Sequence, residues 1–277
     1  MIPDPSLGLS LVLFVAGMAA GVVGAMLGLG GGVFLVPFLV LVLQLPMRHA
    51  VAISLVTVIA TSSVVTSVRM GRSLVNFRLG MLLEVATTAG GLTGGVIAVM
   101  LSAGTLQRMF GVLTIASAVA MLGRLEKRNV ITAAGAETGR LGGRYHEAES
   151  GGVVTYRVKR VPAAMVVSFA AGSLSSLLGV GGGILKVPAL NAWCGVPLRA
   201  AAATSAFMIG VTATSGVVIY YGRGDVVPWM AAATVLGVLA GSRAGFALGE
   251  RAKAKWLKLL LAVILAAVGV IMLVRPR

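Results

Sequence analysis

Long apolar stretches dominate the chain and set its predicted architecture. No charged residue lies between Asp4 and Arg48, and uncharged apolar runs of about 18 residues or more are typical of membrane-spanning helices. Hydropathy predicts ten apolar segments in two sets of five. They cover residues 6–29, 33–45, 50–69, 79–102 and 106–122, then 162–180, 184–194, 200–221, 227–248 and 257–274. We therefore expect an all-α, polytopic membrane protein.

The two sets of segments match one another at a constant offset of 151 residues. Of the 45 positions from Gly28 to Arg72, 15 are identical to their partners. The identical pairs include Pro46 with Pro197, Arg48 with Arg199, Ser54 with Ser205 and Thr61 with Thr212. Internal repeats of this kind are typical of secondary transporters. We expect a first transmembrane repeat (1–122), a cytoplasmic loop (123–160) and a second transmembrane repeat (161–277).

A glycine-rich element occurs once in each half of the chain. Gly28–Gly32 and Gly179–Gly183 each hold four glycines in five positions. Each glycine costs about 1 kcal/mol in a helix interior relative to alanine, so we expect both helices to break there. The next segment, residues 33–45, would extend only about 20 Å as a helix, which is short of the roughly 30 Å hydrocarbon core. The pattern predicts a short or re-entrant segment in each repeat.

The basic residues favour one of two topologies. The loop over residues 123–160 has eight Lys or Arg and four Glu, which favours the cytoplasm because cytoplasmic loops are enriched in Lys and Arg. Inverted repeats would then place Arg199, Arg251, Lys253, Lys255 and Lys258 inside, and Arg223, Arg275 and Arg277 outside. Parallel repeats would exchange these two sets. We expect inverted repeats with both termini outside.

The central loop has a stretch with strand character. Residues 153–158 are largely β-branched and follow a glycine-rich turn signal, a pattern that favours a hairpin. The predicted hairpin pairs Arg144–His146 with Val153–Arg160. A disordered linker is the alternative.

The composition excludes several functional classes. The chain is 58% hydrophobic and 11% charged, whereas soluble domains have about 25% charged residues. The net charge of +15 fits cytoplasmic loop bias and attraction to anionic lipids rather than nucleic acid. The single cysteine, Cys194, excludes an intramolecular disulfide and a cysteine-only metal site. We expect no enzyme activity, cofactor, metal or nucleic-acid partner, and a homodimer is left open.

The glycine-rich elements are candidate anion-binding sites. A helix that starts inside a membrane protein presents unsatisfied N–H groups and a positive dipole end, and this combination binds anions. The candidate backbone positions are Gly28, Gly30, Gly31, Gly32 and Val33, with Gly179, Gly181, Gly182, Gly183 and Ile184. Close helix packing through small residues is the alternative.

Hydroxyl side chains on the next segment of each half support an anion site. Ser54, Thr57 and Thr61 are spaced by three and four residues, which places them on one helical face. Ser205 and Thr212 repeat the outer pair in the second half. Hydroxyls can donate to an oxyanion, although hydrogen bonds to their own helix would explain them equally well.

Two charged residues fall inside apolar segments. Lys186 follows Gly183 by three positions, and the equivalent residue in the first half is Leu35. A lysine at membrane depth usually faces a cavity or partner, so Lys186 is a candidate for selecting anions, unless it reaches the headgroups. Glu84 could carry a coupling proton, pair with a base or lie near the interface.

The two glycine elements, with the repeated Pro-x-Arg turns, resemble those of the TauE/SafE family of sulfite and organosulfur anion exporters. Both elements read G-[LV]-G-G-G-x-x-x-V-P, over Gly28–Pro37 and Gly179–Pro188. The resemblance implies a multi-pass transporter in a bacterial or archaeal inner membrane, moving sulfite or an organosulfonate such as sulfoacetate. With the residue pattern, we expect alternating access around a midplane site. A passive anion channel and a non-transporting assembly subunit are the alternatives.

Overall fold

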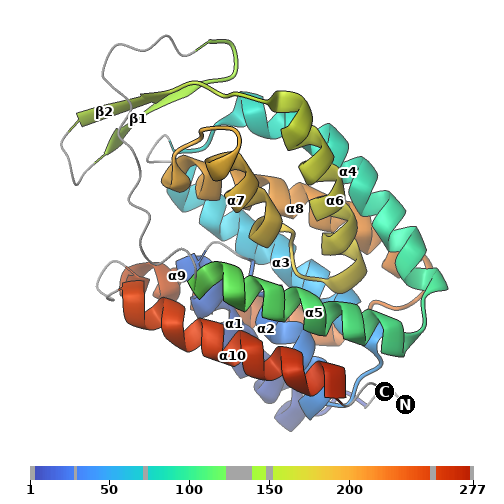
Figure 1. The fold of residues 1–277 in the computed structure, drawn as a ribbon. Coiled ribbons are helices and arrows are strands. Elements are labelled where there is room, and N and C mark those ends of the chain that lie inside the picture. Colours follow the sequence, from blue (N-terminus) through green and yellow to red (C-terminus); the bar gives the residue numbers. More distant parts are fainter. Residues whose placement is uncertain are drawn as a thin grey trace.

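The computed structural model is a bundle of helices with a small hairpin at one end (Figure 1). It describes residues 4–27, 30–70, 74–122, 139–147, 152–249 and 254–274. The helices are α1 (Leu7–Leu27), α2 (Gly32–Pro37), the π-helix η1 (Phe38–Val42), α3 (Met47–Met70), α4 (Phe77–Met100), α5 (Ala103–Leu122), α6 (Val161–Leu178), α7 (Gly183–Ala192), α8 (Leu198–Gly222), α9 (Pro228–Gly249) and α10 (Ala254–Val274). All ten predicted apolar segments are helical.

The lengths of these helices suit a membrane protein. Within the described ranges, five helices are long and apolar enough to cross a membrane: α1, α3, α4, α6 and α8. The 24 residues of α3 extend about 36 Å at 1.5 Å per residue. By contrast, α7 has ten residues, and α2 has six before the backbone widens into η1 after Pro37. The short segments predicted after the glycine elements are therefore confirmed.

Helices from the two halves of the chain pack against one another. The closest pairs are α1 with α9, α4 with α6, α5 with α10 and α3 with α8. A Cβ atom on Gly241 of α9 would lie only 2.0 Å from the carbonyl oxygen of Met18 on α1. Only glycine fits at such a contact, and small residues are the usual means of close packing between membrane helices.

Helices α3 and α8 run in opposite directions. His49, in the first turn of α3, has its Nδ1 atom 2.7 Å from the carbonyl oxygen of Asp225, just after α8. Asn76, six residues past the end of α3, donates its N–H to Thr204 Oγ1 in the second turn of α8, at 3.0 Å. The start of each helix therefore lies beside the end of the other.

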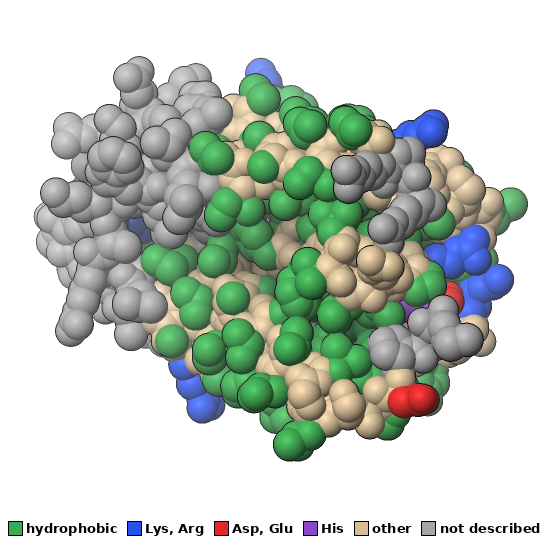
Figure 2. Space-filling view, turned by 90° about the horizontal axis from the view of Figure 1, so that it is seen from below, with side chains coloured by type: hydrophobic (Ala, Val, Ile, Leu, Met, Phe, Trp, Pro, Cys, Tyr) green, Lys and Arg blue, Asp and Glu red, His purple; other side chains and the backbone are tan. Residues whose placement is uncertain are grey.

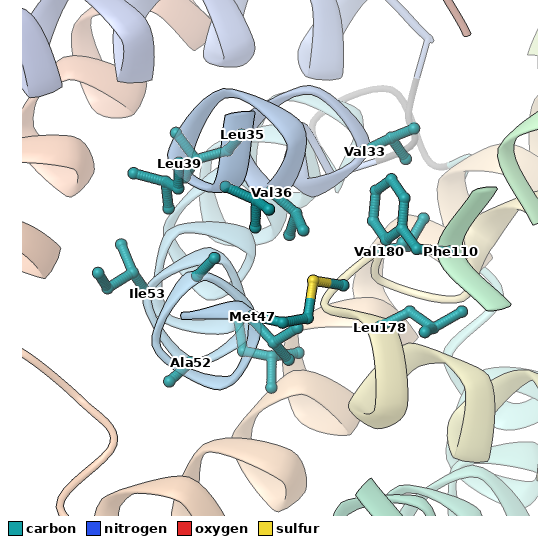
Figure 3. Close-up of a cluster of buried hydrophobic side chains, with 14 of the residues drawn as sticks. Val33, Leu35, Val36, Leu39, Met47, Ala52, Ile53, Phe110, Leu178 and Val180 are labelled. Atoms are coloured by element: carbon teal, nitrogen blue, oxygen red, sulfur yellow. The ribbon is translucent and has the colours of Figure 1, made fainter. Parts of the chain in front are cut away.

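The broken segment of the first half lies in the main hydrophobic core. Val33, Leu35, Val36 and Leu39 are buried there, and Figure 3 shows them above Met47 and Ile53 of α3, with Phe110, Leu178 and Val180 to one side. One face of α2 and η1 therefore belongs to the protein core, while Val42 at the end of η1 is exposed.

A two-stranded antiparallel sheet occupies part of the central loop. Strand β1 (Gly143–Glu147) pairs with β2 (Gly152–Tyr156), with Arg144 opposite Thr155. The second strand is shorter than predicted, because the N–H of Lys159 donates to the carbonyl oxygen of Cys194 instead of to β1.

Apolar side chains also cover much of the outside of the bundle. Met81 and Val85, both on α4, are 65% and 70% exposed. Figure 2 shows hydrophobic side chains across the middle of one face, with Lys and Arg at its edges. An apolar surface with charges confined to the rim is expected where lipid covers a protein.

Candidate functional site

Both glycine elements interrupt the helix, as the sequence predicts. In the first half, Gly30 and Gly31 have φ angles of 85° and 72°, and α2 begins at Gly32. In the second half, Gly179, Gly181 and Gly182 have φ angles of 71°, 82° and 64°, and α7 begins at Gly183. Residues with a Cβ rarely adopt this left-handed region. Gly28 lies outside the described residues.

The two glycine elements touch each other. A Cβ atom on Gly32 would lie 2.1 Å from the carbonyl oxygen of Gly179 and 2.6 Å from Ser54 Oγ. The Ser54 hydroxyl donates to that same carbonyl at 2.7 Å. The cavity beside Gly30 measures about 10 Å³, which is close to the minimum for a single water molecule. The elements therefore meet in a closed arrangement.

The remaining predicted hydroxyls have different surroundings. Thr57 Oγ1 donates to the carbonyl of Ile53 and lies 3.1 Å from Thr234 Oγ1 on α9, while Thr61 Oγ1 donates to the carbonyl of Thr57. Both threonines thus make the hydrogen bonds to their own helix that the alternative interpretation expects. The buried Ser205 hydroxyl, by contrast, has no partner within the described part of the chain.

Lys186 is enclosed by protein. Its side chain is 1% exposed, and Nζ donates to Thr212 Oγ1 on α8 at 3.0 Å. This burial argues against the alternative in which Lys186 reaches the lipid headgroups. A buried ammonium carries a desolvation cost of several kcal/mol unless its charge is compensated.

The compensating group is Glu84 on α4. The Thr212 hydroxyl lies within donor distance of Glu84 Oε1, at 2.8 Å, and Thr88 Oγ1 donates to the same oxygen at 3.3 Å. Glu84 is 8% exposed, and its second oxygen, Oε2, has no hydrogen-bond partner among the described residues. Glu84 is therefore linked to the base Lys186 through the Thr212 hydroxyl.

The link between Glu84, Thr212 and Lys186, here called the charge relay, was not predicted from the sequence. Each residue was a candidate, but they are separated by 128 and 26 positions. Two further buried hydroxyls, Ser175 and Ser176 on α6, also have no partner among the described residues. Their position just before Gly179 was a sequence signal that could have identified them.

A groove of about 640 Å³ lies between α3, α4 and α8, and we call it the hydroxyl groove. Its polar lining comes from Ser62, Ser63, Thr66, Ser67, Thr88, Thr214 and Ser215. One of its lining residues, Thr88, also binds Glu84, so the groove lies one side chain away from the charge relay.

No metal site accompanies these groups. The described residues contain no cluster of three His, Cys, Asp or Glu that could hold a metal ion. The free cysteine, Cys194, is buried. The buried polar side chains among the described residues are Lys186, Glu84, Asn76, Gln107 and a set of serines and threonines.

Comparison with known proteins identifies the family. Probable membrane transporter protein YunE of Bacillus subtilis is 27% identical over 266 residues, covering 94% of this chain and 95% of the relative. Probable membrane transporter protein MJ0441 of Methanocaldococcus jannaschii is 23% identical over 278 residues, covering 95% and 94%. No solved structure matches the chain. The family model of the sulfite exporter TauE/SafE matches residues 13–272, and the chain therefore belongs to this family of multi-pass membrane transporters, which is not a family of enzymes.

Proposed function

We propose that this protein is a secondary transporter, and an exporter, of a small sulfur-containing oxyanion such as sulfite or an organosulfonate like sulfoacetate. The observation that carries the proposal is Lys186, a fully buried cation that follows a glycine break and binds a hydroxyl. A buried lysine in a membrane helix usually serves a substrate or ion pathway. The family name and the relatives from a bacterium and an archaeon support the substrate class and an inner-membrane location.

The binding site would lie between the two glycine elements. Backbone N–H groups from Gly28 to Val33 and from Gly179 to Ile184 would hold the sulfonate oxygens, and Lys186 would supply charge. The hydroxyls of Ser54, Thr57, Thr61, Ser205 and Thr212 would line the site. Because Gly32 and Gly179 are in contact, the elements must separate to admit an anion.

Transport would proceed by alternating access of two inverted repeats. The antiparallel arrangement of α3 and α8 supports this proposal, because these helices carry the matching sequences of the two halves. In transporters built from inverted repeats, one repeat rocks against the other around a site near the midplane. The contact of the glycine elements then corresponds to a closed state.

The test is uptake of radiolabelled sulfite and sulfoacetate into proteoliposomes that contain the purified protein. We expect saturable uptake and counterflow for a sulfur oxyanion, because a transporter binds its substrate in each cycle. A passive channel would give flux that does not saturate. No flux of any sulfur anion would leave the assembly-subunit alternative and overturn the proposal.

A matched pair of variants tests the role of Lys186. Lys186→Ala removes the buried charge, and we expect substrate binding to be lost. Lys159→Ala removes an exposed lysine outside the helices, and we expect flux to stay unchanged. Unaltered binding in the Lys186→Ala protein would show that this lysine has no role in the site.

A further inference from the structure

The charge relay is electrically neutral as a unit. Lys186 Nζ donates to Thr212 Oγ1, and the Thr212 hydroxyl can donate to Glu84 Oε1. The same hydroxyl lies 2.8 Å from the carbonyl oxygen of Met208 on its own helix, so its one proton can go to either oxygen. The relay can hold an ammonium with a carboxylate, or a neutral amine with a protonated carboxyl. The sum of the two charges is zero in both forms, which lowers the cost of burial.

Other charged groups lie away from the relay on the helices that pack around it. Helix α6 has no titratable side chain along its length, and Lys186 is the titratable residue of α7. The remaining ones on α4 and α8 lie near helix ends, and they are Arg78, Arg199, Tyr220 and Tyr221. On α3, which lines the hydroxyl groove with α4 and α8, Arg48 and His49 lie in the first turn and Arg69 in the last. Within these helices, the charge of a bound anion must therefore be balanced by the relay itself.

The relay has an atom suited to take up a proton. Glu84 Oε2 is buried and lacks a donor among the described side chains and backbone, and an ionised oxygen in such a place is costly. A proton on Oε2 would remove that cost. The hydroxyl groove reaches Thr88, which binds the other carboxylate oxygen, so one side chain separates the groove from the carboxyl group.

Anion binding disturbs this neutrality unless a proton arrives as well. One monovalent anion at Lys186 adds one negative charge, and one proton on Glu84 cancels it. We propose that the protein carries one proton with each monovalent anion, with Glu84 as the proton carrier and Lys186 as the anion ligand. This inference rests on the proposed function. The proton enters on Oε2, and Lys186 keeps its N–H donors for the anion.

The first test uses the unmodified protein in proteoliposomes that contain a pH-sensitive dye. The probe is radiolabelled methanesulfonate, a strong-acid anion whose charge does not change with pH near neutrality. We expect saturable uptake, one proton moved with each anion, and no response to an imposed membrane potential. Saturable uptake without proton movement, or uptake that follows the membrane potential, would overturn the inference and leave the proposed function intact.

The second test uses Glu84→Gln, which mimics the protonated carboxyl. We expect at least a tenfold loss of methanesulfonate accumulation driven by a pH gradient, a typical size for coupling between two sites, and we expect the remaining counterflow to be independent of pH. Asp225→Asn is the matched control, because it removes a carboxylate from the α8–α9 loop, and we expect no change. Accumulation that survives in the Glu84→Gln protein would contradict the assignment.

The two proposals can fail separately. Absence of saturable methanesulfonate uptake by the unmodified protein overturns the coupling inference as stated. The proposed function falls as well only if sulfite and sulfoacetate also show no saturable flux. If the Glu84→Gln protein does not fold, the dye measurement on the unmodified protein decides the question.

Discussion

Lys186 occupies the position where the first half of the chain has Leu35, and each side chain is 1% exposed. A leucine fills the equivalent place in the first half, so packing alone does not call for a charge there. Within the second half, Lys186 is held by Thr212 and balanced by Glu84. We infer that the charge of Lys186 serves ligand binding rather than stability, since a buried ion pair is weak evidence for a contribution to stability.

Within the described part of the chain, the hydroxyl of Thr212 links the two charges. Thr212→Val keeps the shape of the side chain but removes the hydroxyl, leaving buried groups without a partner at a cost of about 1–3 kcal/mol. We expect initial rates of sulfite counterflow to fall by about tenfold or more. Thr212→Ser keeps the hydroxyl and should retain most of the rate. Equal rates in both variants would exclude a role for the link.

The contact between Gly32 and Gly179 allows a test of the closed arrangement. Gly32→Ala places a methyl group against the carbonyl oxygen of Gly179, and overpacking of this kind costs about 1–3 kcal/mol. We expect a lower unfolding temperature in detergent and slower transport. Gly8→Ala is the control, because a Cβ atom there meets nothing within 4 Å. An unchanged unfolding temperature for Gly32→Ala would contradict the contact.

At the scale of elements, α4 connects the charge relay to the hairpin. Asn76 caps α4 by accepting from the N–H of Leu79 at 3.0 Å, and its Nδ2 donates to the carbonyl oxygen of Leu141 and to the Tyr156 hydroxyl. Tyr145 and Val154 of the hairpin pack in one cluster of buried residues with the start of α4 and with α8. One asparagine therefore joins the helix that carries Glu84 to the central loop.

Asn76→Ala should loosen the hairpin from the bundle. Loss of an N-cap costs about 1 kcal/mol, and the bonds to Leu141 and Tyr156 disappear with it. We expect faster hydrogen exchange in residues 143–147 and 152–156 and in the first turn of α4. Tyr156→Phe removes one of these bonds and should have a smaller effect. Unchanged exchange in the hairpin would mean that the apolar contacts alone hold it.

At the scale of the whole molecule, the two halves form a single body because their helices pair with one another. Helix α1 lies along α9 and α4 along α6, so the most extensive packing between helices joins the two halves. The antiparallel helices α3 and α8 lie at the centre of this packing between the halves. With 25 residues, α8 extends about 37 Å, so the hairpin at its start and Arg223 at its end lie on opposite sides of the bundle.

This geometry predicts opposite sides of the membrane for two exposed residues. In a Cys194→Ala background, Arg223→Cys should react with a membrane-impermeant thiol reagent added outside intact cells. Lys159→Cys, in the linker after the hairpin, should react only after the cells are opened. Both results follow from inverted repeats with a cytoplasmic central loop. Labelling of Arg223→Cys from the inside alone would contradict the predicted orientation.

The sequence by itself determined the elements of this protein and much of its candidate chemistry. Every predicted apolar segment is a helix whose ends agree within three residues, because a long uncharged run in lipid satisfies its own backbone hydrogen bonds by forming a helix. The glycine elements were predictable as breaks, since glycine weakens a helix and also allows left-handed φ values. These values lie between 64° and 85° at Gly30, Gly31, Gly179, Gly181 and Gly182. Lys186 stood out because its match is a leucine.

Only the tertiary structure decided how these parts meet. The partner of Lys186 could not be found by spacing, since Thr212 and Glu84 lie on other helices, and hydropathy does not say which helices pack together. The contact between Gly32 and Gly179 depends on two backbones 147 positions apart. Local propensity fixes helices and breaks, because those depend on neighbours in the chain. The relay and the closed site depend on the packing between helices, which the folded chain alone defines.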